Sequence, residues 1–168
     1  VLALALFIRV EARKGEAALV PLDIFHSSTF CGAATATAGM TFGMYGVLFL
    51  LPLAWLGAGR LDALGAGLAL MPMALVFVAV SPFSGMLTER YGMRAATGGG
   101  VAVIGAGLLL IGAGADAASL VPSEAGLVLT GFGMGLATGP LMGAAVGAVP
   151  AGRSGTASAL INVARMVG

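Results

Sequence analysis

The side chains of this sequence that could do chemistry are few, and most lie outside its long apolar stretches. The chain carries 8 Lys and Arg, 7 Asp and Glu, 1 His and 1 Cys among 168 residues. The single Cys31 excludes an intrachain disulfide and a thiolate metal cluster, and His26 is expected to be a surface residue. No catalytic triad, nucleotide-binding loop or metal-ligand cluster occurs, so we expect no enzymatic activity, no metal and no cofactor.

Soft and weakly polar side chains within the apolar stretches fit a binding cavity better than a catalytic centre. Thr41 lies four residues after Thr37, and Met44 and Tyr45 lie three and four residues after Thr41, spacings that place them on one face of a helix. Methionine adapts to ligands of many shapes. Later candidates of the same kind are Phe132, Met134, Thr138, Met142 and Asn162. The alternative is that the threonines hydrogen-bond to their own helix and the methionines fill the core.

Arg165 is the one basic side chain in an apolar stretch near the end of the sequence. A charged residue in a membrane helix is costly and is usually paired or functional. Arg165 is therefore a further cavity candidate, with extension of its head group to the cytoplasmic interface as the alternative. No carboxylate occurs within a full span, so a proton-binding acid is expected outside this chain.

The composition predicts the elements that must hold these residues. Hydrophobic residues make up 59% and charged residues 9% of the chain, far from the roughly 25% charge of soluble domains. Four nearly uncharged stretches each exceed the roughly 20 residues that a membrane helix needs, and they lack the alternation of barrel strands. We predict an all-α membrane protein, a polytopic transmembrane helix bundle with spans at 30–56, 64–87, 95–115 and 125–149.

Both ends of the sequence suggest part of a longer protein. Residues 1–8 are apolar but too few to span, so we expect the end of a preceding transmembrane helix. Residues 9–29 are charged and form the expected cytoplasmic linker. Residues 157–168 begin a further span, so residues 30–168 are predicted to hold four full spans and the start of a fifth. With the partial helix at residues 1–8, they would form part of a larger helix bundle.

The basic residues predict the orientation, because Lys and Arg collect on the cytoplasmic side of short loops. Six basic residues fall in the linker and in the connections after the second and fourth spans: Arg9, Arg13, Lys14, Arg90, Arg94 and Arg153. Only Arg60 falls in the connections on the opposite side. The linker and the two basic connections are therefore predicted to face the cytoplasm.

Glycine recurs at every fourth position of the fourth span. The set is Gly131, Gly135, Gly139, Gly143 and Gly147, with Pro140 among them. Small residues at this spacing let two helix backbones approach closely in lipid, and proline removes a helical hydrogen bond. The stripe predicts close helix packing, and a role in the gating motion of a transporter is the alternative.

The second connection has a sequence that is more specific than its charges. Gly85, Leu87, Glu89, Arg90, Gly92 and Arg94 occupy spaced positions in Gly-Met-Leu-Thr-Glu-Arg-Tyr-Gly-Met-Arg. Gly92 suits a tight turn, and the arginines can bind phosphates or the carbonyl ends of helices. A charged hairpin that only fixes the topology is the alternative.

This stretch resembles the Gly-x-Leu-x-Asp-Arg-x-Gly-Arg-Arg signature of the major facilitator superfamily, with Glu89 in place of Asp and Met93 in place of the first closing Arg. Residues 21–25 resemble the linker before the second half of such a transporter, and residues 150–168 resemble the Pro-x-x-x-x-Gly-x-Ala-Ser-x-x-x-x-x-Arg segment of that half. The resemblance implies a piece of the C-terminal half of a 14-span drug:proton antiporter, in which the signature serves conformational change.

By this resemblance we expect secondary active, proton-coupled efflux of drugs or amphipathic small molecules by alternating access, from a multi-pass protein of the bacterial inner membrane. The expected partners are a small-molecule substrate, the lipid bilayer, protons and the missing N-terminal half, and not nucleic acid. An importer or metabolite carrier of the same fold, and a small membrane or assembly protein without transport, stay open as alternatives.

Overall fold

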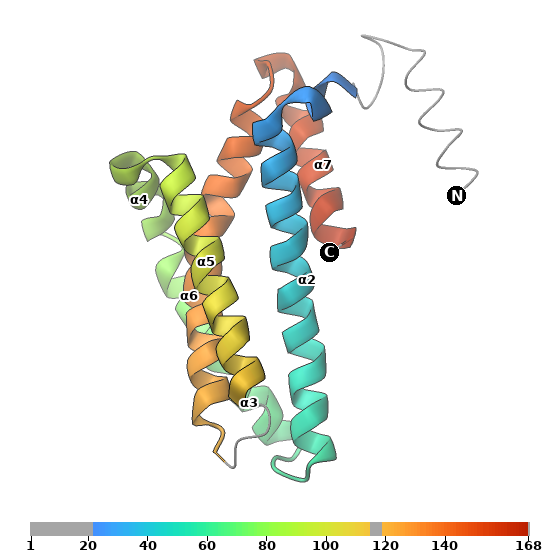
Figure 1. The fold of residues 1–168 in the computed structure, drawn as a ribbon, viewed down its shortest axis with the longest axis vertical. Helices are drawn as coiled ribbons and strands as arrows, with labels where there is room; N and C mark the ends of the chain where they lie inside the picture. Colours follow the sequence, from blue (N-terminus) through green and yellow to red (C-terminus); the bar gives the residue numbers. More distant parts are fainter. Residues whose placement is uncertain (1–21, 115–118, 168) are drawn as a thin grey trace, which may run out of the picture.

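The computed structural model describes residues 22–114 and 119–167, and every regular element in these ranges is helical (Figure 1). The all-α fold class is confirmed. The elements are η2 (Leu22–His26), α2 (Ser28–Gly57), α3 (Ala63–Val80), α4 (Phe83–Tyr91), α5 (Met93–Gly114), α6 (Val121–Gly147), η3 (Ala151–Arg153) and α7 (Ser154–Val167). The predictions for residues 1–8 and for 9–21 of the linker lie outside the described residues.

Short polar side chains begin two of the long helices. The Ser27 hydroxyl accepts a hydrogen bond from the Phe30 N–H at 3.3 Å, and the Asp62 carboxylate accepts one from the Gly65 N–H at 2.8 Å. Both side chains satisfy a backbone donor that has no partner within its own helix. The beginnings of α2 and α3 are thus fixed by residues just outside the apolar stretches.

Four of the described helices, α2, α3, α5 and α6, are long and apolar enough to cross a membrane. Many large apolar side chains point outward from them, including Phe42, Phe49 and Leu109, which are 71%, 75% and 77% exposed. In water such a surface would be unfavourable. In a bilayer, lipid tails or other apolar helices are suitable neighbours for such side chains.

The predicted span 64–87 is not one helix. α3 ends at Val80 and α4 begins at Phe83, with Ser81 and Pro82 between them. Pro82 has no N–H to continue the hydrogen-bond ladder. The predicted connection at residues 89–94 is correspondingly shorter, because α4 runs to Tyr91 and only Gly92 separates it from α5.

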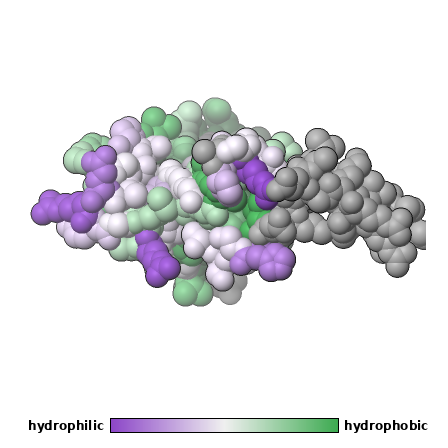
Figure 2. All heavy atoms as spheres, turned by 90° about the horizontal axis from the view of Figure 1, so that it is seen from above, coloured by the Kyte–Doolittle hydropathy of each residue, from purple (hydrophilic) through white to green (hydrophobic). Residues whose placement is uncertain are grey.

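The connections fall into two groups at opposite ends of the bundle. The start of α2, the α4–α5 junction and the α6–α7 junction lie at the upper end in Figure 1, and the α2–α3 connection lies at the lower end. Figure 2 shows hydrophilic residues gathered on the upper end. Arg90, Arg94 and Arg153 are therefore at one end and Arg60 is at the other, the arrangement that the basic-residue pattern predicts.

The most extensive packing in the bundle joins α5 and α6, and it is built on glycines seven residues apart. A Cβ atom added at Gly107 would lie 2.7 Å from the Gly126 carbonyl oxygen, and one added at Gly126 would lie 2.6 Å from the Gly107 carbonyl oxygen. Two helical turns further along the contact, a Cβ added at Gly100 or at Gly133 would likewise lie within 3 Å of the carbonyl oxygen of the other glycine. The two backbones are in direct contact, which only glycine permits.

The glycine stripe of α6 faces a different neighbour. A Cβ at Gly131 would overlap the backbone of Met73, one at Gly135 would lie 2.9 Å from Val80 Cβ, and one at Gly139 would lie 2.8 Å from Ser84 Oγ. Gly143 has only an ordinary contact, and Gly147 has open space around it. α6 thus packs closely on α5 through one face and on α3 and α4 through another, and it is the most buried of the long helices.

Candidate functional site

A cavity of about 320 Å³ lies between α2, α3, α6 and α7. Its wall is almost entirely apolar and contains four methionines. The lining residues are Met40, Thr41, Met44, Leu48, Leu70, Met73, Ala74, Phe77, Met134, Thr138 and Arg165. An unbranched, polarizable wall of this kind adapts to apolar ligands of different shapes.

The hydroxyl protons of the two threonines in this wall are both used in hydrogen bonds to their own helices. Thr41 donates its hydroxyl proton to the Thr37 carbonyl oxygen, and Thr138 donates to the Met134 carbonyl oxygen, both at 2.8 Å. Each hydroxyl oxygen keeps its lone pairs, so towards a ligand it acts as an acceptor. Thr41 and Thr138 thus bond back to their own helices and also line the cavity, so the two interpretations of these threonines do not exclude each other.

Arg165, in the last turn of α7, is the only charged residue of the cavity wall. Its side chain is partly buried, and among the described residues it has no hydrogen-bond or ion-pair partner. A guanidinium beside an apolar wall keeps its charge and presents up to five donors. The cavity therefore offers one cationic, donor-rich point in otherwise apolar surroundings.

The structure brings together five of the cavity residues chosen from the sequence: Thr41, Met44, Met134, Thr138 and Arg165. Five others do not reach the cavity. Thr37 is fully buried beneath it, Met142 is partly buried elsewhere on α6, and Tyr45, Phe132 and Asn162 are exposed on the outside of the described bundle.

The wall that α3 contributes was missed by the sequence analysis, which considered only the first, fourth and last apolar stretches. Leu70, Met73 and Phe77 follow at three- and four-residue spacings and so share a face of α3. That spacing was visible in the sequence, but α3 is apolar all round, so periodicity alone does not single out the inner face.

The signature residues Gly85 to Arg94 lie on α4 and at the start of α5, at the same end of the bundle as the first turn of α2. Gly92 has a φ of 83°, a value that a residue with a side chain rarely adopts, and it turns the chain directly from α4 into α5. The Arg90 guanidinium lies 5.6 Å from the ring centre of Tyr91, and Leu87 is partly buried while Gly85 and Glu89 are exposed.

The whole chain, residues 1–168, matches the Major Facilitator Superfamily. The Multidrug resistance protein Stp of Mycobacterium tuberculosis (strain ATCC 25618 / H37Rv) is 29% identical to it over 164 residues, which are 98% of this chain and 30% of that protein. The Tetracycline resistance determinant of Streptomyces rimosus is 35% identical over 91 residues, 53% of this chain and 26% of that protein.

A third relative, the Triacylglyceride transporter of Mycobacteroides abscessus, is 57% identical over 42 residues, which are 25% of this chain and 8% of that protein. No solved structure matches the chain significantly. The chain spans only about 30% of the length of the Stp relative. Since the family match extends over every residue and the described helices include four that are suited to a bilayer, this chain is a multi-pass membrane protein that belongs to the Major Facilitator Superfamily.

Proposed function

We propose that this chain forms part of a secondary active transporter that exports drugs or other amphipathic small molecules by alternating access, in the 14-span drug:proton antiporter branch of its family and in a bacterial inner membrane. The observation that carries the proposal is the methionine-rich cavity of about 320 Å³ that α2, α3, α6 and α7 enclose. The names of two relatives, which refer to multidrug and tetracycline resistance, support the same substrate class.

The composition of the cavity wall favours ligands with an apolar body and one polar group. Met40, Met44, Met73 and Met134 supply a surface that can adapt to different molecules. Arg165 provides a single fixed charge at the edge of this surface. A molecule that places an acceptor or an anionic group on Arg165 and its apolar part against the methionines satisfies both.

Proton coupling, if it operates as we propose, requires a titratable acid outside the cavity wall, because none of the lining residues is acidic. Within the described helices, Glu89 and Glu124 lie near helix ends and not in the middle of a span. We therefore place the proton-binding carboxylate in another part of the full-length polypeptide.

The test uses the full-length polypeptide that carries these residues, in inside-out membrane vesicles. We expect an added substrate such as tetracycline to cause proton release from energised vesicles, and we expect Met44→Ala to weaken this response several-fold. Met71→Ala is the matched control, because Met71 is 56% exposed on the outer face of α3 and does not line the cavity. Proton release with no substrate dependence, or equal effects of the two variants, would count against the proposal.

A second candidate substrate class is favoured by one observation. Apart from Thr41, Thr138 and Arg165, the lining residues are apolar, so the cavity also suits an acyl chain. One relative is named a triacylglyceride transporter. Competition between a neutral acylglycerol and tetracycline in the same vesicle assay separates the two classes.

A further inference from the structure

The polar residues of the methionine-rich cavity lie at a similar depth in the bundle. Thr41 is thirteen residues from the start of α2, Thr138 nine residues from the end of α6 and Arg165 eleven residues from the start of α7. At about 1.5 Å per residue, all three lie roughly 14 to 20 Å from the upper end of the bundle in Figure 1. Leu48 and Leu70 line the cavity nearer the lower end, so its lower part is apolar.

The depth of Arg165 is unusual for a charged side chain. The hydrocarbon core of a bilayer is about 30 Å thick, so a residue roughly 16 Å along α7 from its upper end lies near the middle of the membrane. That distance is longer than an arginine side chain, which argues against the alternative that the head group extends to the cytoplasmic interface. A charge at this depth is costly unless a counter-charge or polar partner accompanies it.

The described part of the chain offers Arg165 no such counter-charge. Its acidic residues, Asp23, Asp62, Glu89 and Glu124, all lie near helix ends, and none of them lines the cavity. The guanidinium of Arg165 is therefore left with its full set of donors in a partly buried position. An anion in the cavity would supply the missing partner.

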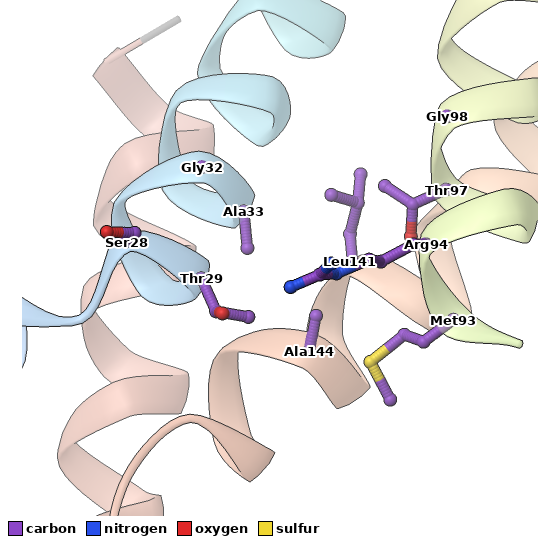
Figure 3. A pocket seen from close by; sticks show the side chains of 10 residues that line it. All are labelled: Ser28, Thr29, Gly32, Ala33, Met93, Arg94, Thr97, Gly98, Leu141 and Ala144. Carbon is purple, nitrogen blue, oxygen red and sulfur yellow. The ribbon is translucent and has the colours of Figure 1, made fainter.

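Arg94 provides the contrast within the same molecule. Figure 3 shows its side chain extending from α5 into a second cavity, of about 510 Å³, at the upper end of the bundle. Arg94 is exposed, whereas Arg165 is partly buried. Water can solvate the charge of Arg94, so its position requires no ligand, and the argument for an anion applies to Arg165 alone.

We propose that the methionine-rich cavity selects amphipathic molecules with an anionic head group, and that Arg165 is the residue that determines this specificity. A guanidinium forms paired, charged hydrogen bonds with carboxylate or sulfonate oxygens. The hydroxyl protons of Thr41 and Thr138 are already used, so among the lining side chains Arg165 alone donates strong hydrogen bonds to an anion. A cationic head group at the same place is repelled, because apolar surroundings screen charge weakly.

The position of Arg165 also orients the ligand. With its head group on Arg165, the apolar body extends along the methionines towards Leu48 and Leu70 at the lower part of the cavity. This inference deepens the proposed function and rests on it in taking this cavity as the substrate site. It adds the sign of the charge that the substrate carries.

The experiment compares two probes that share one apolar body, naphthalene-2-sulfonate and 2-naphthyltrimethylammonium. Their binding to the full-length polypeptide in lipid nanodiscs is measured by isothermal titration calorimetry, with empty nanodiscs as the background. We expect the wild type to bind the sulfonate about tenfold or more tightly than the ammonium compound. Arg165→Gln should weaken sulfonate binding alone and remove most of this preference, and Arg165→Lys, which keeps the charge but not the planar fork, should retain part of it.

Two further variants separate charge from packing. Arg60→Gln is the matched control, because it removes the same charge from an exposed residue that does not line the cavity, and it should leave both affinities unchanged. Met44→Ala changes only the apolar wall, so it should weaken both probes alike. Should Arg165→Gln fail to fold, Arg165→Lys and the preference of the wild type provide the test.

Equal affinities of the two probes for the wild type, no binding of either probe, or equal weakening of both in Arg165→Gln would overturn the inference. Proton release driven by tetracycline, measured in vesicles, tests the proposed efflux separately. Proton release without a charge preference rejects anion selection alone. A clear preference for the sulfonate without proton release rejects the efflux and leaves anion binding in place.

Discussion

The contact between α5 and α6 leads to a sharp prediction about two glycines of one helix. Gly105 and Gly107 are two residues apart on α5, but they have opposite surroundings. A Cβ added at Gly107 would lie 2.7 Å from the Gly126 carbonyl oxygen and 2.8 Å from the Thr130 nitrogen. A Cβ added at Gly105 would have no atom outside its own helix within 4 Å.

The magnitude follows from the distances. Ordinary contact with a Cβ begins at 3.4 Å, so Gly107→Ala forces the two backbones apart by about 0.7 Å along their closest approach. A gap of this size forfeits a quarter to a half of the dispersion energy of the atoms involved. Overpacking of this kind costs about 1–3 kcal/mol, whereas Gly105→Ala has only the small gain in helix propensity.

The assay is thermal unfolding of the two variants and the wild type, measured on the full-length polypeptide in one detergent. We expect Gly107→Ala to lower Tm by several degrees and Gly105→Ala to leave it unchanged or raise it slightly. Both variants make the same change in the same helix, so propensity cancels from the comparison. Equal Tm values for the two variants would refute the reasoning.

A double variant tests whether backbone contact is the cause. Thr130→Ala removes the hydroxyl oxygen that lies 2.5 Å from the added Cβ at Gly107, but it leaves the backbone of α6 in place. We therefore expect Thr130→Ala to restore little of the Tm lost in Gly107→Ala. Full restoration would show that a side chain, and not the backbone, limits the approach of the two helices.

Three further predictions concern helix ends and topology. Gly92→Ala should cost about 1–2 kcal/mol because its φ is 83°, while Gly85→Ala, with open space around it, should change Tm little; similar losses would contradict this. Asp62→Ala should lower the free energy of unfolding by about 1 kcal/mol through loss of the α3 cap, and Asp62→Asn should retain most of it. In a Cys31→Ala background, Arg90→Cys and Arg60→Cys should react with a membrane-impermeant thiol reagent from opposite sides, and labelling from the same side would refute the topology.

The fold was predictable because its strongest signal is the physics of the bilayer. Helices α2, α5 and α6 begin and end within a few residues of the predicted spans, since a long uncharged stretch has no other way to satisfy its backbone in lipid. The break at Pro82 was less apparent, because apolar residues continue on both sides of it and hydropathy does not register a missing N–H.

The candidate cavity was only partly predictable. Met44 and Thr41 were found because their spacing places them on one face of α2, but Tyr45 follows the same spacing and is 56% exposed. Helical spacing indicates which residues share a face, but it does not show which neighbour covers that face. The close pairing of α5 with α6 was likewise missed, because the conspicuous glycines of α6 recur every four residues while the glycines in contact with α5 recur every seven.

The interruption between α3 and α4 has a mechanical consequence when it is set beside α6. Gly135 packs against Val80 and Gly139 packs against Ser84, so Pro82 lies at the same depth as the stretch of α6 that ends in Pro140. Two neighbouring helical columns of the bundle therefore each lose backbone hydrogen bonds at one common level. Since they are in close contact on both sides of that level, we expect a bend in one column to be accompanied by a bend in the other.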